Sequence, residues 1–378
     1  MKIIIAPDKF KGSLSSAAVC DAIAKGIQQA DKNITIHAFP MADGGDGFAT
    51  VMQYYTKTKT ILCLTVDPLG RPIQAAYQWN ADTKTAIIEL AAASGLVLLE
   101  PSERDPMKTS TYGSGLLVKD ALGKGAKKII LGIGGSATND AGTGILSALG
   151  FGLLDARNKP VTASGENLIS IQKIIPPPVQ TPVQFEIACD VENPLYGPQG
   201  AAFVYAPQKG ATKETVQLLD KGLRHFAALT AAQTNKNLAE QPGTGAAGGI
   251  AAGLMPFLNV VLKQGTQLVI EASKIKNDLG AVDIIITGEG KIDQQSKSGK
   301  LISSIAALAK QHHIPVIAIC GSLQLNEQEV VALGLQKAYS ILDESKGLEY
   351  AIKNAADLLS KQTARVVASF LVSKKWPA

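Results

Sequence analysis

The sequence has few of the residues that build metal centres or covalent cross-links. It contains four cysteines and four histidines among 378 residues, and the cysteines lie far apart, with no Cys-x-x-Cys spacing. This pattern excludes a zinc ribbon and a disulfide framework, and the scarcity of histidine argues against a histidine-rich metal site. We therefore expect a protein of the reducing cytoplasm.

Long apolar runs and blocks of like charge are missing as well. No apolar run approaches the ~20 residues of a transmembrane helix, and the opening MKIIIAPDKFKGS lacks the pattern of a secretory signal. The 37 basic and 32 acidic side chains give a formal net charge of only +5, too little for a nucleic-acid groove. With 46% apolar and 18% charged residues, disorder is excluded. We expect a soluble monomer or homodimer that binds neither nucleic acid nor membrane.

What the sequence does have is an alternation of short apolar runs with helical patterns, at both ends of the chain. This alternation is typical of an α/β fold with a largely parallel sheet. Strands are predicted over residues 2–5, 34–39, 283–287, 316–320 and 338–342, and helices over 15–29, 47–55, 301–312, 326–333 and 348–371.

The middle of the chain has a different pattern. Residues 60–66, 73–79 and 85–90 read as strands joined by turns, a meander, and buried strands follow over 128–132 and 185–189. We therefore predict two α/β domains. Residues 1–60 plus 270–378 form a doubly wound, flavodoxin- or Rossmann-like parallel-sheet domain, and 61–269 form an inserted domain with a mixed sheet.

Glycine-rich polar runs follow several of the predicted strands. Glycine lets a ligand approach the backbone closely, and a helix that starts there offers free N–H groups to anions. One run contains Asp8, Lys9 and Lys11, another contains Asp43 to Asp46, and a third contains Glu289 to Asp293. Carboxylates mixed with lysines suit Mg²⁺ and phosphate together, because the metal and the lysines share the negative charge of the ligand.

The run Gly132–Gly142, GIGGSATNDAG, leaves two interpretations open. It contains the G-x-G-x-x-A pattern of a dinucleotide fold, with Asp155 placed where an acid could bind a ribose. A nicotinamide-dependent hydroxy-acid dehydrogenase is therefore an alternative. Against it, Thr138, Asn139 and Asp140 put polar groups where a dinucleotide-binding helix packs apolar ones.

Other catalytic signatures are absent. The chain has no G-x-x-x-x-G-K-[ST] phosphate loop and no G-x-S-x-G nucleophile elbow, and no histidine lies in a motif. Several loops suited to anions, spare carboxylates and no acyl-transfer machinery favour phosphoryl transfer from a Mg²⁺-nucleotide.

Taken in order, these segments resemble the bacterial glycerate kinase family. The matching runs are APDKFKGSLSS, ADGGDG, GIGGSATNDAGTG, CDVENPLYGPQGAA, QKGA, GTGAAGGIAAGL and TGEGKIDQQSKSGK. The resemblance implies an ATP- and Mg²⁺-dependent kinase acting on D-glycerate in the cytoplasm, with two α/β domains and an active-site cleft between them. It implies 2-phosphoglycerate as the product, with 3-phosphoglycerate as the alternative.

On that resemblance we assign roles to the polar residues, since phosphoryl transfer requires the protein mainly to position reactants and neutralise charge. Asp190 or Asp293 would be the general base, and the catalytic Lys209 would help to neutralise the charge of the nucleotide phosphates. Asp43 and Glu289 would bind Mg²⁺. The substrate would contact Asp8, Lys9, Lys11 and Asn193. The nucleotide phosphates would contact Gly44, Gly45, Gly134, Gly135, Ser136, Thr138, Asn139, Lys291 and Lys300.

Overall fold

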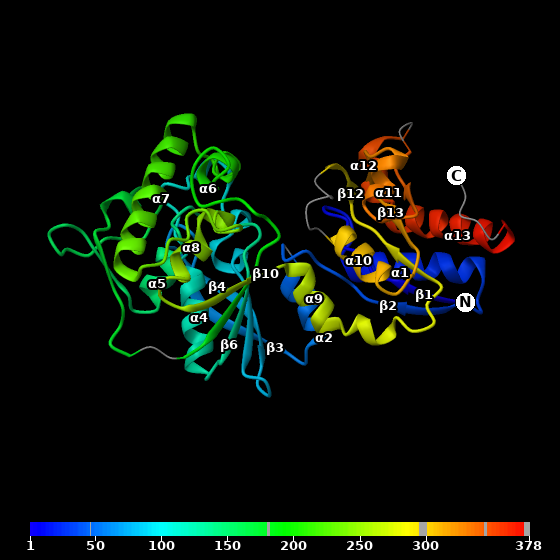
Figure 1. Ribbon diagram of the computed structural model, residues 1–378, viewed down its shortest axis with the longest axis horizontal. Helices are drawn as coiled ribbons and strands as arrows, with labels where there is room; N and C mark the ends of the chain where they lie inside the picture. The colour runs from blue at the N-terminus through cyan, green and yellow to red at the C-terminus, as the bar shows by residue number, and fades with distance from the viewer. Residues whose placement is uncertain (46, 180–181, 295–300, 344–345, 374–378) are drawn as a thin grey trace. The chain divides into compact units, whose positions relative to one another are not determined.

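The computed structural model describes residues 1–45, 47–179, 182–294, 301–343 and 346–373. The chain divides into two compact units, which are described separately (Figure 1). Unit 1 consists of Met1–Asp43 and Thr266–Ala378, and unit 2, Gly44–Gly265, is inserted between these two parts.

Unit 1 contains a five-stranded, fully parallel sheet with the order β15-β13-β11-β1-β2. This is the predicted doubly wound arrangement, and the chain order reverses between the neighbours β1 and β11. Ligands in such sheets bind outside the carboxyl ends of the strands at this reversal. The strands are β1 (Lys2–Ile5), β2 (Thr35–Ala38), β11 (Ile284–Thr287), β13 (Val316–Cys320) and β15 (Lys337–Ser340), and a small two-stranded sheet pairs β12 (Lys291–Ile292) with β14 (Ser322–Leu323).

Helices cover both faces of this sheet. On one face α1 and α13 pack side by side (Figure 1), so closely that a Cβ on Gly26 would lie 2.3 Å from the Ser360 carbonyl oxygen. α1 begins after Ser15, whose hydroxyl accepts the Ala18 N–H and so caps the helix. The helices are α1 (Ser16–Ala30), α9 (Gly265–Ser273), η6 (Ile275–Asp278), α10 (Leu301–Lys310), α11 (Glu327–Ala332), α12 (Gly347–Lys353) and α13 (Ala355–Ser373).

The prediction of a single long helix over 348–371 is wrong in one respect, because two helices cover this range. The helix is broken at Asn354, whose N–H still bonds to Tyr350 while its backbone leaves the helical region, so α12 and α13 are separate. The apolar periodicity continues across the break, and for that reason the sequence pattern did not reveal it.

Unit 2 contains a six-stranded mixed sheet with the order β10-β9-β6-β5-β4-β3. β3, β4 and β5 form the predicted antiparallel meander, whereas β5, β6, β9 and β10 are parallel. The strands are β3 (Lys59–Val66), β4 (Pro72–Asn80), β5 (Thr85–Glu89), β6 (Lys128–Gly132), β9 (Gln184–Ala188) and β10 (Asn259–Lys263), with a separate hairpin of β7 (Gly152–Leu154) and β8 (Lys173–Ile175).

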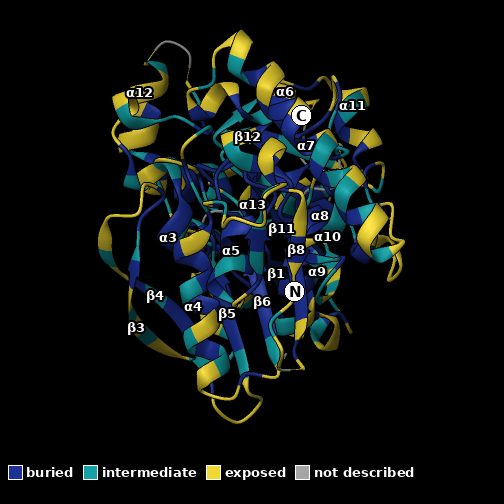
Figure 2. Cartoon of the chain, turned by 90° about the vertical axis from the view of Figure 1, so that its left-hand side faces the viewer, coloured by how far each residue is buried: buried dark blue, intermediate teal, exposed yellow. Residues whose placement is uncertain are grey.

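The main core of unit 2 lies between this sheet and the helices on one face, and the central strands β5, β6 and β9 are mostly buried (Figure 2). α2 packs in unit 2: Phe48 lies against Gly132, and the Ala49 N–H donates to Glu89. The helices are α2 (Phe48–Tyr55), α3 (Ala91–Ser94), η1 (Leu96–Leu98), η2 (Pro101–Glu103), α4 (Tyr112–Gly123), α5 (Thr143–Ala148), η3 (Glu166–Ser170), α6 (Ala201–Tyr205), η4 (Pro207–Lys209), α7 (Lys213–Thr234), η5 (Ala246–Gly248) and α8 (Ile250–Leu254).

The register of the parallel strands in unit 2 aligns their carboxyl ends. Gly132 pairs with Glu89 on one side and with Ala188 on the other, and Ala188 also pairs with Lys263. The polar loops that follow these four residues therefore leave the sheet along one edge. The predicted functional runs of unit 2 begin there.

Candidate active site

Three carboxylates of unit 1 follow the carboxyl ends of strands at the point where the chain order reverses. Asp8 follows β1, Asp43 follows β2 and Glu289 follows β11. Asp8 is buried, and its Oδ1 accepts the Lys9 N–H at 2.7 Å. Burial, then the negative charge of Asp43 and to a smaller extent that of Glu289, raise the pKa of Asp8 to about 7, against the opposing effect of the Lys9 N–H. The three carboxylates thus form an acidic cluster that a cation would stabilise.

The acidic cluster suits a magnesium ion that arrives with other ligands. Among the residues that the structure describes, no three His, Cys, Asp or Glu side chains gather closely enough to hold a metal by themselves. Mg²⁺ is commonly bound by one or two carboxylates together with waters and substrate phosphates. Asp43 and Glu289, the predicted ligands, therefore fit a metal carried by a nucleotide better than a permanently bound one.

The predicted cations of unit 1 lie on the neighbouring loops. The side chain of Lys11 is exposed. Its loop packs against the loop after β11, where a Cβ on Gly290 would lie 3.1 Å from the backbone nitrogen of Lys11. Lys291 Nζ forms an ion pair with Asp293 Oδ2 at 3.0 Å. This links a predicted phosphate ligand to a predicted general base. Lys300 lies outside the described residues.

The glycine-rich loop of unit 2, residues 133–142, is held in place by its backbone. Ala137 donates its N–H to the Ser94 carbonyl at 2.9 Å and accepts the Thr109 hydroxyl at 2.8 Å. Ala141 donates to the Gly248 carbonyl at 3.0 Å. Gly135, with φ +69°, occupies the left-handed region that glycine tolerates. The loop is therefore fixed before any ligand binds.

Asp140 organises the end of this loop, a role that the sequence interpretation did not assign although the residue lies in the quoted run. Its carboxylate accepts the backbone N–H and the hydroxyl of Thr111, both at 2.8 Å, and the N–H groups of Gly142 and Gly144, both at 3.2 Å. Complete burial raises the pKa of Asp140, and these hydrogen bonds oppose the rise. The pattern marks Asp140 as a positioning residue for the loop.

Lys209 is a buried cation beside the same loop. Its side chain is 2% exposed, and Nζ donates to Ser136 Oγ at 2.8 Å and to the Thr138 carbonyl at 2.7 Å. Burial lowers the pKa of Lys209 to about 7, an effect that the charge of Asp140 partly offsets. Both hydrogen-bond partners are neutral, so a bound anion would favour the charged ammonium strongly. The structure thus brings the predicted Lys209, Ser136 and Thr138 together.

The loop also holds buried polar atoms whose hydrogen bonds are not made within the protein. Thr138 Oγ1 and both side-chain amide atoms of Asn139 are buried and have no partner among the described residues. Such atoms are uncommon in native proteins, because each one costs about 1–3 kcal/mol unless a ligand or water pairs with it. Next to Lys209, the two donors among them, Thr138 Oγ1 and Asn139 Nδ2, indicate a place prepared for a polar, negatively charged group.

Asp190 lies at the carboxyl end of β9, close to two glycines. Its Oδ1 and Oδ2 accept the Gly265 N–H, the first of α9, at 3.1 and 3.3 Å. A Cβ on Gly44 would lie 2.8 Å from Asp190 Oδ2 and 2.9 Å from the Gly265 Cα. Gly44, predicted as a phosphate contact, is thus also required for this close packing.

Asn193, predicted to bind substrate, takes part in the local fold. Its Nδ2 donates to the Gln199 carbonyl at 2.8 Å, and its Oδ1 accepts the Tyr205 hydroxyl. The side chain therefore braces the segment between β9 and α6. Its contact with substrate stays a prediction.

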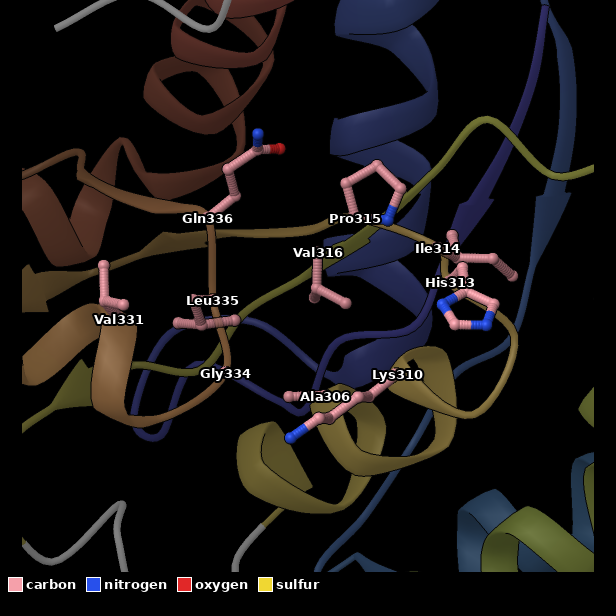
Figure 3. A pocket seen from close by; sticks show the side chains of 10 residues that line it. All are labelled: Ala306, Lys310, His313, Ile314, Pro315, Val316, Val331, Gly334, Leu335 and Gln336. Atoms are coloured by element: carbon pink, nitrogen blue, oxygen red, sulfur yellow. The ribbon is translucent and has the colours of Figure 1, made fainter.

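Unit 1 has an open pocket of about 420 Å³ away from the acidic cluster (Figure 3). Lys310 at the end of α10, His313 in the next turn, Val316 at the start of β13 and Leu335 before β15 contribute to its lining. Because these residues lie at the amino ends of the strands, the pocket is at the opposite edge of the sheet from Asp8. It contains no predicted site residue.

Each unit is an α/β structure; unit 1 carries the acidic cluster, and unit 2 carries the buried Lys209 beside the glycine-rich loop. The sequence model of the Glycerate kinase family matches residues 3–371. The chain therefore belongs to the glycerate kinase family and is a kinase. In the part that the structure describes, no helix is long and apolar enough to cross a membrane.

Individual relatives agree with this assignment. The chain is 42% identical to the glycerate kinase of Halalkalibacterium halodurans over 97% of both chains, and 38% identical to the glycerate 2-kinase of Escherichia coli over 99% of both. The crystal structure of a glycerate kinase 2 from Salmonella typhimurium matches with a TM-score of 0.85, at 38% identity and covering 99% of both chains.

Proposed function

We propose that this kinase transfers the γ-phosphoryl group of ATP to the 2-hydroxyl of D-glycerate, giving 2-phospho-D-glycerate and ADP. The proposal is carried by the family match over residues 3–371, together with a relative named glycerate 2-kinase at 38% identity over 99% of both chains. The four free cysteines suit the reducing cytoplasm, where we place the reaction.

Unit 2 would supply the phosphate site. Gly134, Gly135, Ser136, Thr138 and Asn139 would surround the phosphates with backbone and side-chain donors. Lys209 would neutralise charge, and its surroundings of neutral partners support this role. Gly44, Gly45, Lys291 and Lys300 are the further phosphate contacts that we propose.

In the chemical step a new bond forms between the substrate oxygen and the γ-phosphorus, and the bond between that phosphorus and the bridging oxygen of ADP breaks. The hydroxyl proton passes to a carboxylate, for which Asp190 and Asp293 are the two candidates. Lys9 or Lys11 would hold the glycerate carboxylate, with Asp8 and Asn193 as further substrate contacts.

Asp43 and Glu289 would hold Mg²⁺, supported by the acidic cluster at the reversal point of unit 1. When bound, the ion spreads the negative charge of the phosphates and reduces their repulsion of the attacking oxygen. Asp8, buried between these charges, would be ionised more readily beside a cation.

The test measures ADP release with D-glycerate in a coupled assay and identifies the product by NMR. Glycerol, which lacks the carboxylate, and D-lactate, which lacks the 3-hydroxyl and keeps the configuration at C2, are matched control substrates. We expect turnover with D-glycerate and a phosphorus coupling to the proton on C2. Coupling to the C3 protons would instead establish the 3-phosphate, and ATP-independent oxidation with NAD(P) would overturn the kinase reaction.

A further inference from the structure

Arg104 lies in unit 2 on a short segment that is fixed on both sides. Before it, the η2 residue Glu103 accepts hydrogen bonds from the Arg71 guanidinium, with Nη1 to Oε1 at 2.6 Å. After it, Asp105 Oδ1 accepts the Met107 N–H at 3.1 Å. The backbone at Arg104 is therefore held independently of its own side chain, which is free to serve another purpose.

This segment packs against the residue that follows Lys209. A Cβ on Gly210 would lie 2.0 Å from the Arg104 carbonyl oxygen and 3.1 Å from the Arg104 Cβ. Gly210 itself has φ +99°, so both its backbone and its contacts require glycine. The backbone of Arg104 therefore contacts the residue directly after Lys209, so the two side chains leave the backbone from neighbouring positions.

Ser164 reaches the same region from a third segment. A Cβ on Gly165, the next residue, would lie 2.2 Å from the Pro106 carbonyl oxygen and 3.3 Å from the Asn139 carbonyl oxygen. The Glu166 N–H also donates to the Met107 carbonyl at 2.9 Å. The segments that carry Arg104, Asn139 and Ser164 are thus in mutual contact.

Each of these segments has a buried polar atom with an unmet hydrogen bond. Arg104 Nε and Ser164 Oγ have no partner among the described residues, like Thr138 Oγ1 and the Asn139 amide. Ser164 is 5% exposed, and Thr138 and Asn139 are completely buried. One orphaned atom could be incidental, but four side chains on touching segments indicate one shared ligand.

We propose that Arg104 and Ser164, with Thr138 and Asn139, form an oxyanion site that binds a phosphate group of the nucleotide. The inference rests on the proposed function and adds two residues to its phosphate site. Arginine binds phosphate with two parallel hydrogen bonds, which lysine cannot form. Two cations from adjacent segments, Arg104 and Lys209, match the charge of a phosphate better than the single charge of the glycerate carboxylate.

The experiment uses the full chain and measures the affinity for tripolyphosphate and for ADP by calorimetry in EDTA, beside the KM values for ATP and D-glycerate. The variants are Arg104→Gln and Ser164→Ala. Their matched controls are Arg157→Gln and Ser170→Ala, at exposed positions of the same unit. Arg104→Lys tests whether charge alone suffices.

We expect Arg104→Gln to weaken tripolyphosphate and ADP binding and to raise the KM for ATP, each by tenfold or more. The KM for glycerate should change less than twofold. Ser164→Ala should weaken tripolyphosphate binding about threefold or more, Arg104→Lys should restore only part of the affinity, and both controls should behave as the unmodified chain.

Unchanged tripolyphosphate affinity in both Arg104→Gln and Ser164→Ala would overturn the inference, as would a defect confined to the KM for glycerate. Circular dichroism checks folding, and Ser164→Ala, a smaller change, keeps the test decisive if Arg104→Gln does not fold. The proposed function fails separately, if the unmodified chain binds tripolyphosphate but does not phosphorylate glycerate.

Discussion

The buried ammonium of Lys209 makes a quantitative prediction about proton uptake. Its pKa is lowered from 10.5 to about 7, so at pH 8 only about one-tenth of the free protein carries the charge. A phosphate bound beside Nζ favours the ammonium and returns its pKa towards the ordinary value. Binding of ADP at pH 8 should therefore take up as much as ~0.9 proton per chain.

Calorimetry in two buffers of different ionisation enthalpy, such as HEPES and Tris, measures this uptake. The slope of the observed enthalpy against the ionisation enthalpy of the buffer gives the number of protons transferred. EDTA excludes Mg²⁺, which would otherwise release protons from Asp8. Lys209→Met should abolish the uptake, whereas Lys213→Met, at an exposed position on the first turn of α7, should leave it intact.

Two results would refute this reasoning. A slope near zero for the unmodified chain at pH 8 would mean that Lys209 is already charged before ADP binds. An undiminished slope in Lys209→Met would mean that another group takes up the proton. If Lys209→Met still binds ADP, the affinity for ADP should lose the part of its pH dependence between about pH 6 and 8 that the titration of Lys209 causes.

Other predictions concern the acidic cluster, the loop and the general base. Burial raises the pKa of Asp8 from 3.8 to about 7, so the unfolded chain loses its proton first and stability falls as the pH rises through this window. Asp8→Asn should be the more stable protein above pH 7 by up to roughly 4 kcal/mol, with the gap closing below pH 4, as urea unfolding at several pH values would show. A gap that does not vary with pH would contradict the assignment. Gly248→Ala should lower kcat/KM at least tenfold and destabilise the fold by about 1–3 kcal/mol, because φ is +75° and the new Cβ would lie 2.3 Å from the Thr138 carbonyl oxygen. Gly123→Ala is its control, because no atom lies within 4 Å of the Cβ that alanine would add at Gly123. Equal effects of the two substitutions would argue against displacement of the loop. Asp190→Asn and Asp293→Asn test the two candidates for the general base. The variant that removes the true base should have a kcat lower by about 10²-fold or more, and near-normal kcat in both variants would exclude both carboxylates as the base.

Much of the architecture follows from local sequence. The buried strands β1 and β13 are continuous runs of β-branched and other apolar residues followed by turns, so their bounds can be read from the sequence alone. β10 was not predicted, because Asn259–Lys263 is an edge strand whose residues are half-buried or exposed, and it lacks a buried run. The break at Asn354 was also missed, since it does not interrupt the apolar pattern.

The candidate site likewise combines features that the local sequence shows with features that depend on tertiary packing. The positions of glycine, carboxylate and lysine in the loops at strand ends can be read from the sequence, because turning the chain there requires particular residues. The burial of Lys209 against Ser136 and Thr138, which lie about seventy positions earlier in the chain, follows only from the tertiary structure. Only it placed Arg104 and Ser164 beside that loop. Burial and unmet hydrogen bonds depend on which distant segments pack together, and no local pattern of residues records that packing.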